Sequence, residues 1–469
     1  MFDLELSYSI LLVLCLVAAC GFEFVNGFHD TANAVATVIY TNSLKPWVAV
    51  VWSGICNFLG VLFSGITVAV GIINLLPVES LVDQNIAHGL AMVMALLFSA
   101  IFWNLLTWYY GIPCSSSHTL IASILGVGIA YALLPGTGEA AVDWSQAKKI
   151  GLSLLISPLI GFTMTIIMMF LIRVLTRKTK HADNLFKEPK KDTPPPAWIR
   201  SILILTSTAV SFSHGSNDGQ KGVGLVMLIL IGIVPSYFAL NTGESPQAFV
   251  QSNQTIELIL QKVNPEPLSE SGKKSLAASL ALTQDLHPHL AAASINDVPK
   301  DERFLIRKDV MLIDRNVRDL LEAPELNLSE TDQVTLKAST KKLRKLIDYS
   351  PCWVVVMIAL SIGLGTMVGW KRIVKTIGEK IGKEHLNYAQ GASSELVAAS
   401  TIGLSSLYGW PVSTTQVLSS GIAGSMVANK GVKNLQIETV RNIMLAWFLT
   451  LPVVMILSGT LFLLFRSIF

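Results

Sequence analysis

The chain has 469 residues, of which 51% are hydrophobic and 14% are charged, and its mean hydropathy is +0.54. A soluble globular protein carries about 25% charged residues, so this composition excludes one large soluble domain and predicts a polytopic membrane protein. The net charge of +3 is too small to indicate a nucleic-acid partner, and the five cysteines include no C-x-x-C pair that would indicate a metal or redox site.

The first polar motif, NGFHDTAN at residues 26–33, lies between apolar stretches at 7–22 and 31–40. One continuous helix over both stretches would be about 50 Å long, whereas the hydrocarbon core of a bilayer is ~30 Å thick. We therefore expect the helix to be interrupted around Gly27–Asp30. An acid at membrane depth is costly, so Asp30 indicates a functional site.

The first membrane repeat is expected to cover residues 1–175. A second polar motif, GIPCSSSHT at 111–119, occurs within it. The apolar segments around this motif predict the membrane spans 47–76, 85–110 and 150–175. Residues 176–198 are basic and contain three consecutive prolines, and the positive-inside rule predicts that this linker is cytoplasmic.

The second membrane repeat is expected to start at residues 199–239, which contain the motif HGSNDGQK at 214–221. Residues 240–349 mix acidic and basic side chains and predict a soluble helical insert. Residues 350–469 complete the repeat and contain the motif GWPVSTTQV at 409–417. The prediction is therefore an all-α polytopic transporter with ten to twelve membrane segments.

The two halves repeat the same pair of motifs in the same order. Asp30 precedes Ser115 by 85 residues, whereas Asp218 precedes Ser413 by 195, and the excess of 110 equals the length of the insert. Transporters built from two such repeats bind their substrate near the bilayer midplane, at helices that are broken or re-entrant. Because the linker between the halves suggests an odd number of crossings in each, we expect the repeats to be inverted.

The downstream motif of each half places hydroxyl side chains after a Gly-x-Pro and at the start of an apolar helix. Proline suits the first helical turn, and the free N–H groups there attract anions. Two such helix starts at midplane would bind a tetrahedral oxyanion, phosphate or sulfate, although serine and threonine are also ordinary helix caps. The candidate ligands are Ser115, Ser116, Ser117, Ser413, Thr414 and Thr415.

The two aspartates suit Na⁺, a hydrated divalent cation, or the uptake and release of protons. Aligning the two Gly-x-x-Asp motifs superposes Asp30 on Asp218 and Asn33 on Lys221. Asn33 can lend a carbonyl oxygen to a cation, whereas the Lys221 ammonium can occupy the place of an ion. This difference favours protons as the coupling ion. Glu395 is a further candidate for carrying a proton or cation, or else a residue at the membrane edge.

Together these residues resemble the inorganic phosphate transporter (PiT) family, whose signature is a duplicated Gly-x-x-Asp-x-x-Asn element followed by Pro-x-Ser-(Ser/Thr)-(Ser/Thr). The resemblance covers both halves except the insert, and Lys221 within GQKG is similar to the bacterial low-affinity Pit branch. It implies that Asp30, Asn33 and Asp218 occupy cation-site positions and that the six hydroxyl residues hold phosphate.

The resemblance further implies a symporter that imports inorganic phosphate through the bacterial inner (plasma) membrane. The expected coupling ion is the proton, and the substrate is phosphate or a metal–phosphate complex whose metal contacts Asp30 and Asp218. A Na⁺-coupled phosphate symporter and a sulfate permease of the same architecture remain alternatives. No enzyme and no resident cofactor are expected, because the sequence shows no nucleophile–base spacing and no Walker A motif. The expected partners are phosphate and the lipid bilayer, and a homo-oligomer is left open.

Overall fold

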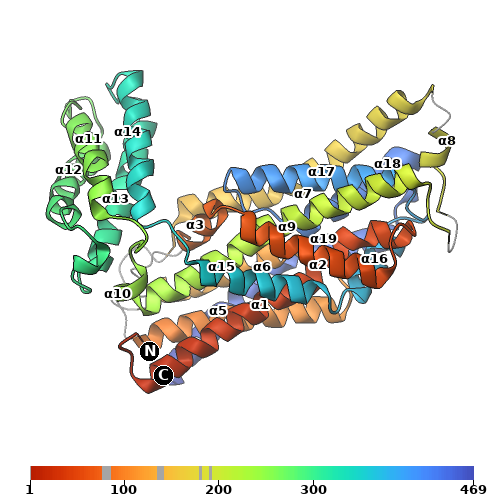
Figure 1. Ribbon diagram of the computed structural model, residues 1–469, viewed down its shortest axis with the longest axis horizontal. Helices are drawn as coiled ribbons and strands as arrows, with labels where there is room; N and C mark the ends of the chain where they lie inside the picture. Colours follow the sequence, from red (N-terminus) through yellow and green to blue (C-terminus); the bar gives the residue numbers. More distant parts are fainter. Residues whose placement is uncertain (1, 76–85, 135–141, 179–181, 190–192, 469) are drawn as a thin grey trace. The chain divides into compact units, whose positions relative to one another are not determined.

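The computed structural model describes residues 2–75, 86–134, 142–178, 182–189 and 193–468 (Figure 1). These residues form helices and no β-strand, apart from a single bridge between Gly382 and Leu435, so the predicted all-α class is confirmed. The chain divides into two compact units, one of residues 3–229 with 351–469 and the other of residues 230–350, and each is described by itself.

The larger unit contains the apolar helices of both halves. Its helices are α1 (Leu6–Tyr40), α2 (Pro46–Phe63), α3 (Thr67–Ile73), α5 (Ile86–Tyr109), α6 (Ser116–Ala132), α7 (Trp144–Thr176), α8 (Ala182–Leu185), α9 (Ala197–Ile233), α15 (Cys352–Thr366), α16 (Lys371–Glu379), α17 (Tyr388–Leu407), α18 (Thr414–Lys430) and α19 (Ile437–Ile468). Many of their large apolar side chains are exposed, as expected for helices that face lipid.

The expected break around Gly27–Asp30 is wrong, because α1 is one helix of 35 residues. Gly27 serves a different purpose. A Cβ atom added there would collide with the carbonyl oxygen of Ile362 and lie 2.9 Å from the nitrogen of Thr366, both on α15. The glycine therefore lets two helix backbones cross closely, and Asp30 is fixed one turn further along α1.

The second half repeats this crossing with exchanged partners. A Cβ atom on Gly215 of α9 would collide with the backbone of Asn57 on α2. Thus the first helix of one half packs against the second helix of the other, in both directions. The later helices do the same, since α7 packs mainly against α18 and α19 against α6. This reciprocal exchange is the packing that two repeats related by a two-fold axis would produce.

The two Gly-x-Pro-x-Ser motifs also fold alike. Gly111 and Gly409 end the preceding helices with φ angles of +67° and +72°, in the left-handed region that favours glycine. In each copy the glycine N–H and the following N–H bond back to the end of the helix, as in a Schellman turn. Ser115 and Ser413 then cap α6 and α18, accepting hydrogen bonds from the backbone N–H groups of residues 118 and 416 at 3.1 and 3.2 Å.

Five helices in the described part of the chain are long and apolar enough to cross a bilayer, namely α1, α2, α5, α7 and α19. The count is six if α15 and α16, which are bent by 63°, form one broken span. This is fewer than the ten to twelve segments expected. The reason is that α6 and α18 have only 17 residues each, while α9 carries the charged residues Asp218 and Lys221 in its middle.

The smaller unit, residues 230–350, is a separate helical body with its own apolar core. Its main helices are α10 (Pro235–Phe238), α11 (Val250–Leu260), α12 (Glu270–Leu290), α13 (Arg303–Glu322) and α14 (Glu330–Leu343). The buried Arg307 donates to the carbonyl oxygens of Ala239 and Ile347 at 3.2 and 2.9 Å, which ties together the two ends of the unit. Arg344 pairs with Asp314 and Asp348, both at 2.7 Å.

Candidate functional site

Asp218 and Lys221 form the centre of a buried polar cluster. They lie one turn apart on α9, and both side chains are almost completely inaccessible to solvent. The Lys221 ammonium donates to Asp218 Oδ1 and to Ser117 Oγ, each at 2.5 Å, and to the carbonyl oxygen of Val412 at 2.7 Å. Three acceptors match the three protons of the ammonium, so a fixed positive charge fills this position.

Lys221 also joins the starts of the two repeated helices. Ser117 lies in the first turn of α6, and Val412 immediately precedes the cap of α18. Ser117 Oγ donates to the carbonyl oxygen of Val412 at 3.0 Å, so the two helix starts contact each other directly. The structure therefore brings the two hydroxyl-bearing motifs together, although they are nearly 300 residues apart in sequence.

Asp30 lies on α1 beside the start of α18. Its Oδ1 accepts a hydrogen bond from the Thr415 hydroxyl and lies 3.1 Å from His29 Nδ1. The other ring nitrogen of His29 lies 3.3 Å from Thr107 Oγ1, on α5. Thr414, the preceding residue of α18, donates to Asp218 Oδ2 at 3.4 Å. Consecutive threonines of one helix start thus contact the aspartates of both halves.

His214 brings the two aspartates into one group. Ligand atoms of Asp30, His214 and Asp218 all lie within 4.8 Å of one another, and all three residues are buried. His214 Nδ1 lies 2.7 Å from Asn57 Oδ1. Its Nε2 faces Asp218 Oδ2 at 3.4 Å and has no hydrogen-bond partner among the described residues. Two carboxylates and an imidazole in this arrangement can bind a cation or exchange protons.

The other predicted hydroxyl ligands differ in how they are engaged. Ser115 and Ser413 use their side chains as helix caps. Ser116 Oγ is buried and, within the described part of the chain, has no partner. The side chain of Asn33 lies outside the described residues.

Glu395 lies on α17 and forms a separate polar contact. Its Oε2 accepts from Thr206 Oγ1 of α9 at 2.5 Å, and its Oε1 accepts from Thr37 Oγ1 of α1. The residue is completely buried within the bundle. Thr37 lies two turns after Asp30 on the same helix, so Glu395 contacts the same two helices that carry the aspartates.

Glu23 is a buried acid that sequence reasoning missed. It lies two turns before Asp30 on α1 and receives one hydrogen bond, from Asn26 Nδ2 to its Oε2 at 3.1 Å. A Cβ atom on Gly222, next to Lys221, would lie 2.6 Å from Glu23 Oε1, so the glycine makes room for this carboxyl group. The seven-residue spacing from Asp30 was the signal that could have identified it.

Several buried polar atoms around the cluster lack a hydrogen-bond partner in the described part of the chain. They are Glu23 Oε1, Asn26 Oδ1, both amide atoms of Asn104, Ser116 Oγ and His214 Nε2. They come from α1, α5, α6 and α9, the helices that surround the aspartates. Buried polar groups are normally satisfied, so a concentration of unsatisfied ones is typical of a site that takes up a polar ligand or water.

Comparison with known proteins identifies the family of the chain. The model of the phosphate transporter family, PHO4, matches residues 26–458. The low-affinity inorganic phosphate transporter PitA of Escherichia coli K12 is 40% identical, over 98% of this chain and 97% of that protein. The probable low-affinity inorganic phosphate transporter of Bacillus subtilis is 28% identical over the full length of both chains.

A solved structure described as the sodium-dependent phosphate transporter shares the fold. Its TM-score is 0.56 at 17% identity, and the match covers 98% of this chain and 100% of that one. The family match and the 40% relative extend over both halves and the insert, and these relatives are transporters, not enzymes. The chain therefore belongs to the phosphate transporter family.

Proposed function

We propose that the chain is a proton-coupled symporter that imports inorganic phosphate through the inner membrane of a bacterium. The observation that carries the proposal is the Lys221 ammonium, which fills a buried position between Asp218 and the two helix starts. A cation-coupled site needs a vacancy for its ion. Here the Lys221 side chain occupies the cation position next to Asp218, which supports coupling by protons over coupling by Na⁺.

The charges in the cluster support symport. Asp30 and Asp218 carry two negative charges and Lys221 carries one positive charge, so the group is negative before Glu23 is counted. In a medium of low dielectric constant a negative site repels a phosphate anion strongly. Phosphate therefore needs protons or a cation to enter with it, and uncoupled passage of the anion would be slow.

The helix starts of α6 and α18 supply the anion-binding groups in this proposal. The first N–H groups of each helix have no intrahelical partner, and their dipoles favour negative charge. Ser116 Oγ is buried and unpartnered among the described residues, and the next residue, Ser117, accepts a hydrogen bond from Lys221. The hydroxyl groups of Ser117, Thr414 and Thr415 now donate to Val412 and the two aspartates. A phosphate bound at this position would accept these hydrogen bonds instead.

Protons have two sets of carriers in the proposal. The first is Asp30 with His29 and His214, which lie in contact beside the helix starts. The second is Glu395, whose two hydrogen bonds come from neutral hydroxyl groups. Because a hydroxyl can donate or accept, Glu395 can gain and lose a proton while it keeps these contacts.

A metal–phosphate complex is a second candidate substrate. The group of Asp30, His214 and Asp218 offers three ligand atoms within 4.8 Å of one another, which suits a divalent cation that arrives with phosphate as cargo. Phosphate oxygens and water would complete its coordination. The reciprocal packing of α1 with α15 and of α9 with α2 supports inverted repeats, which would let the two halves rock about this group.

The experiment is uptake of labelled phosphate by proteoliposomes that contain the purified protein. The Asp30→Asn variant should lose uptake at unchanged protein content. Ser117→Ala should raise the phosphate KM, whereas Ser123→Ala should not, because this matched change on the same helix removes a hydroxyl that donates to the carbonyl oxygen of Leu120. Normal uptake by Asp30→Asn, or the same KM in both serine variants, contradicts the assignment. Sulfate transported as well as phosphate would favour the sulfate alternative.

A further inference from the structure

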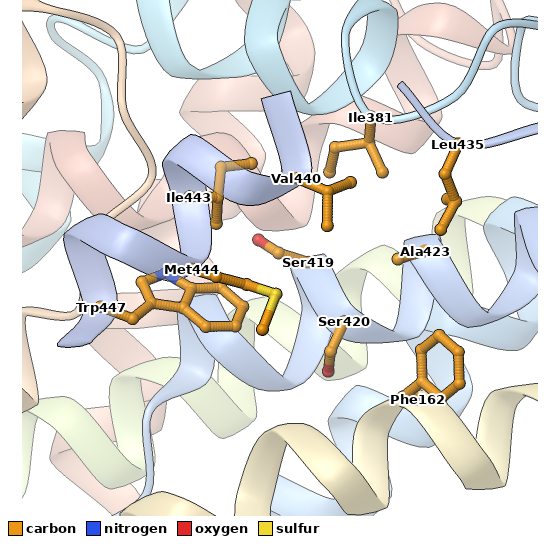
Figure 2. Close-up of a pocket in the computed structure, with 10 residues that line it drawn as sticks. All are labelled: Phe162, Ile381, Ser419, Ser420, Ala423, Leu435, Val440, Ile443, Met444 and Trp447. Carbon is orange, nitrogen blue, oxygen red and sulfur yellow. The ribbon is translucent and has the colours of Figure 1, made fainter. Parts of the chain in front are cut away.

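A cavity of about 150 Å³ lies between α18 and the first turns of α19, and neither aspartate is among its lining residues (Figure 2). Its wall is almost wholly apolar. The side chains that define it include Phe162, Ala423, Val440, Ile443, Met444 and Trp447. A cavity of this size lined mainly by apolar side chains accepts an apolar group of about the size of benzene.

The cavity exists because α18 presents small residues to α19. Ser419, Ser420 and Ala423 lie on one face of α18, at spacings that share a helix side. α18 also packs tightly against α7, since a Cβ atom on Gly424 would collide with the backbone of Phe162, a residue whose side chain lines the cavity. A shift of α18 toward α19 that closed the gap would give up this contact.

The cavity opens to the outside of the bundle. Met444 on its rim is 60% exposed, while Ile443 on the inner wall is 6% exposed. The neighbouring positions of α19 are also exposed and apolar, including Leu445 and Phe448. In a membrane such a face contacts lipid chains, so the opening is continuous with the hydrocarbon of the bilayer.

Exposed basic side chains lie close in sequence to residues that line the cavity. Ile381 and Leu435 line the cavity, and the segments that carry them are joined by main-chain hydrogen bonds, Lys383 N to Asn434 O at 2.8 Å and Gln436 N to Ile381 O at 2.9 Å. Over residues 379–384 and 430–441 there are five basic side chains and three acidic ones, a net charge of +2. The basic residues are Lys380, Lys383, Lys430, Lys433 and Arg441, and the acidic ones are Glu379, Glu384 and Glu438.

Two of these acids are already engaged. Glu384 pairs with Lys430 at 2.5 Å, and Glu379 accepts from the Tyr40 hydroxyl at 2.9 Å. The same end of the bundle carries Arg173 of α7, which donates to Asn429 of α18 at 3.3 Å. The basic linker follows α7 directly, so the positive-inside rule indicates the cytoplasmic leaflet.

We propose that this cavity seats an acyl chain of an anionic phospholipid of the cytoplasmic leaflet, with its headgroup held by the surrounding lysines and arginine. Lys380, Lys383, Lys433 and Arg441 are exposed and flank residues that line the cavity. Basic pockets between membrane helices on the cytoplasmic side bind anionic headgroups. The lipid would fill the gap between α18 and α19, and so stabilise the helix whose start contacts Asp30 and Asp218.

The test is native mass spectrometry of the full-length protein with equal amounts of phosphatidylglycerol and phosphatidylethanolamine that carry the same acyl chains. The wild type should retain phosphatidylglycerol preferentially. Because each basic residue near an anionic headgroup contributes roughly fivefold, Lys380→Gln with Lys383→Gln should weaken retention roughly 25-fold. The control Lys341→Gln with Lys342→Gln removes the same charge from exposed positions of α14 and should change nothing.

A second variant tests the acyl-chain part of the proposal. Ala423→Phe fills the cavity and should abolish retention, whereas Leu159→Phe, at an exposed position of α7, should not. Equal retention of the two lipids, or phosphatidylglycerol bound normally by Ala423→Phe, would overturn the proposal. So would displacement of the lipid by an equal amount of glycerol phosphate, since that would assign the binding to the headgroup alone. If Ala423→Phe does not fold, the lipid competition and the double lysine variant decide the question.

Discussion

Replacing Lys221 by asparagine tests the buried charge that distinguishes the two halves. Lys221→Asn removes the ammonium that now contacts Asp218, Ser117 and Val412 at 2.5, 2.5 and 2.7 Å. Asp218 would keep only the Thr414 hydroxyl at 3.4 Å and the nearby His214. The variant also gives the second half the residue type that the first half has at Asn33.

Breaking a buried ion pair by removing one partner costs about 3–5 kcal/mol, because the other charge stays buried and uncompensated. This corresponds to roughly a 100- to 4,000-fold change in an equilibrium constant. The variant should therefore be markedly less stable than the wild type at neutral pH. A cation that replaces the ammonium would restore stability, by about 2.7 kcal/mol at a concentration 100 times its Kd.

The assay is thermal unfolding of the purified protein in NaCl and in choline chloride, together with phosphate uptake under the same conditions. Na⁺ should raise the Tm of Lys221→Asn and stimulate its uptake, and should do neither in the wild type. The double variant Asp218→Asn with Lys221→Asn removes both charges and should be destabilised by less than the sum of the single changes. A Lys221→Asn protein with wild-type stability and no response to Na⁺ would refute the reasoning.

Three further predictions concern helix crossing, the first aspartate and the smaller unit. Gly27→Ala should lower the Tm because its Cβ collides with α15, whereas Gly21→Ala on the same helix meets no atom within 4 Å and should not, as thermal unfolding will show. Thr415→Val should reduce the uptake rate roughly 10- to 100-fold by removing a hydrogen bond to a charged group, while Thr415→Ser should retain it. Burial raises the pKa of Tyr349 to about 12, so stability present below pH ~10 should fall as the pH rises toward 12, and by less in Tyr349→Phe, which unfolding at each pH will measure.

The sequence was sufficient to predict the elements whose signals are local. Apolar segments predict membrane helices, and the Gly-x-Pro-x-Ser motifs predict the start of α6 and α18, because a left-handed glycine and a serine cap need only neighbouring residues. The contact between those two helix starts could be inferred from the repeat, since the second copy occurs in the same order after the insert is removed.

The errors come from distant contacts. A break around Gly27 was expected because one continuous helix would be too long for a single upright crossing, whereas the glycine permits a close contact with Ile362 on α15. Glu23 was missed because nothing in its neighbourhood shows that Gly222, 199 residues away, leaves room for its carboxyl group. The two hydroxyl partners of Glu395 come from α1 and α9, so these contacts could not be predicted from α17 alone.

The measurement that tests the proposed coupling most directly is phosphate uptake by proteoliposomes with pH, Na⁺ and Mg²⁺ varied independently. An inward proton gradient should drive accumulation in the absence of Na⁺, because the Lys221 ammonium already fills the position of a cation next to Asp218. Stimulation by Mg²⁺ at a fixed proton gradient would identify the metal–phosphate complex as the transported species. Uptake that depends on Na⁺ at constant pH, with no response to the proton gradient, would contradict the account.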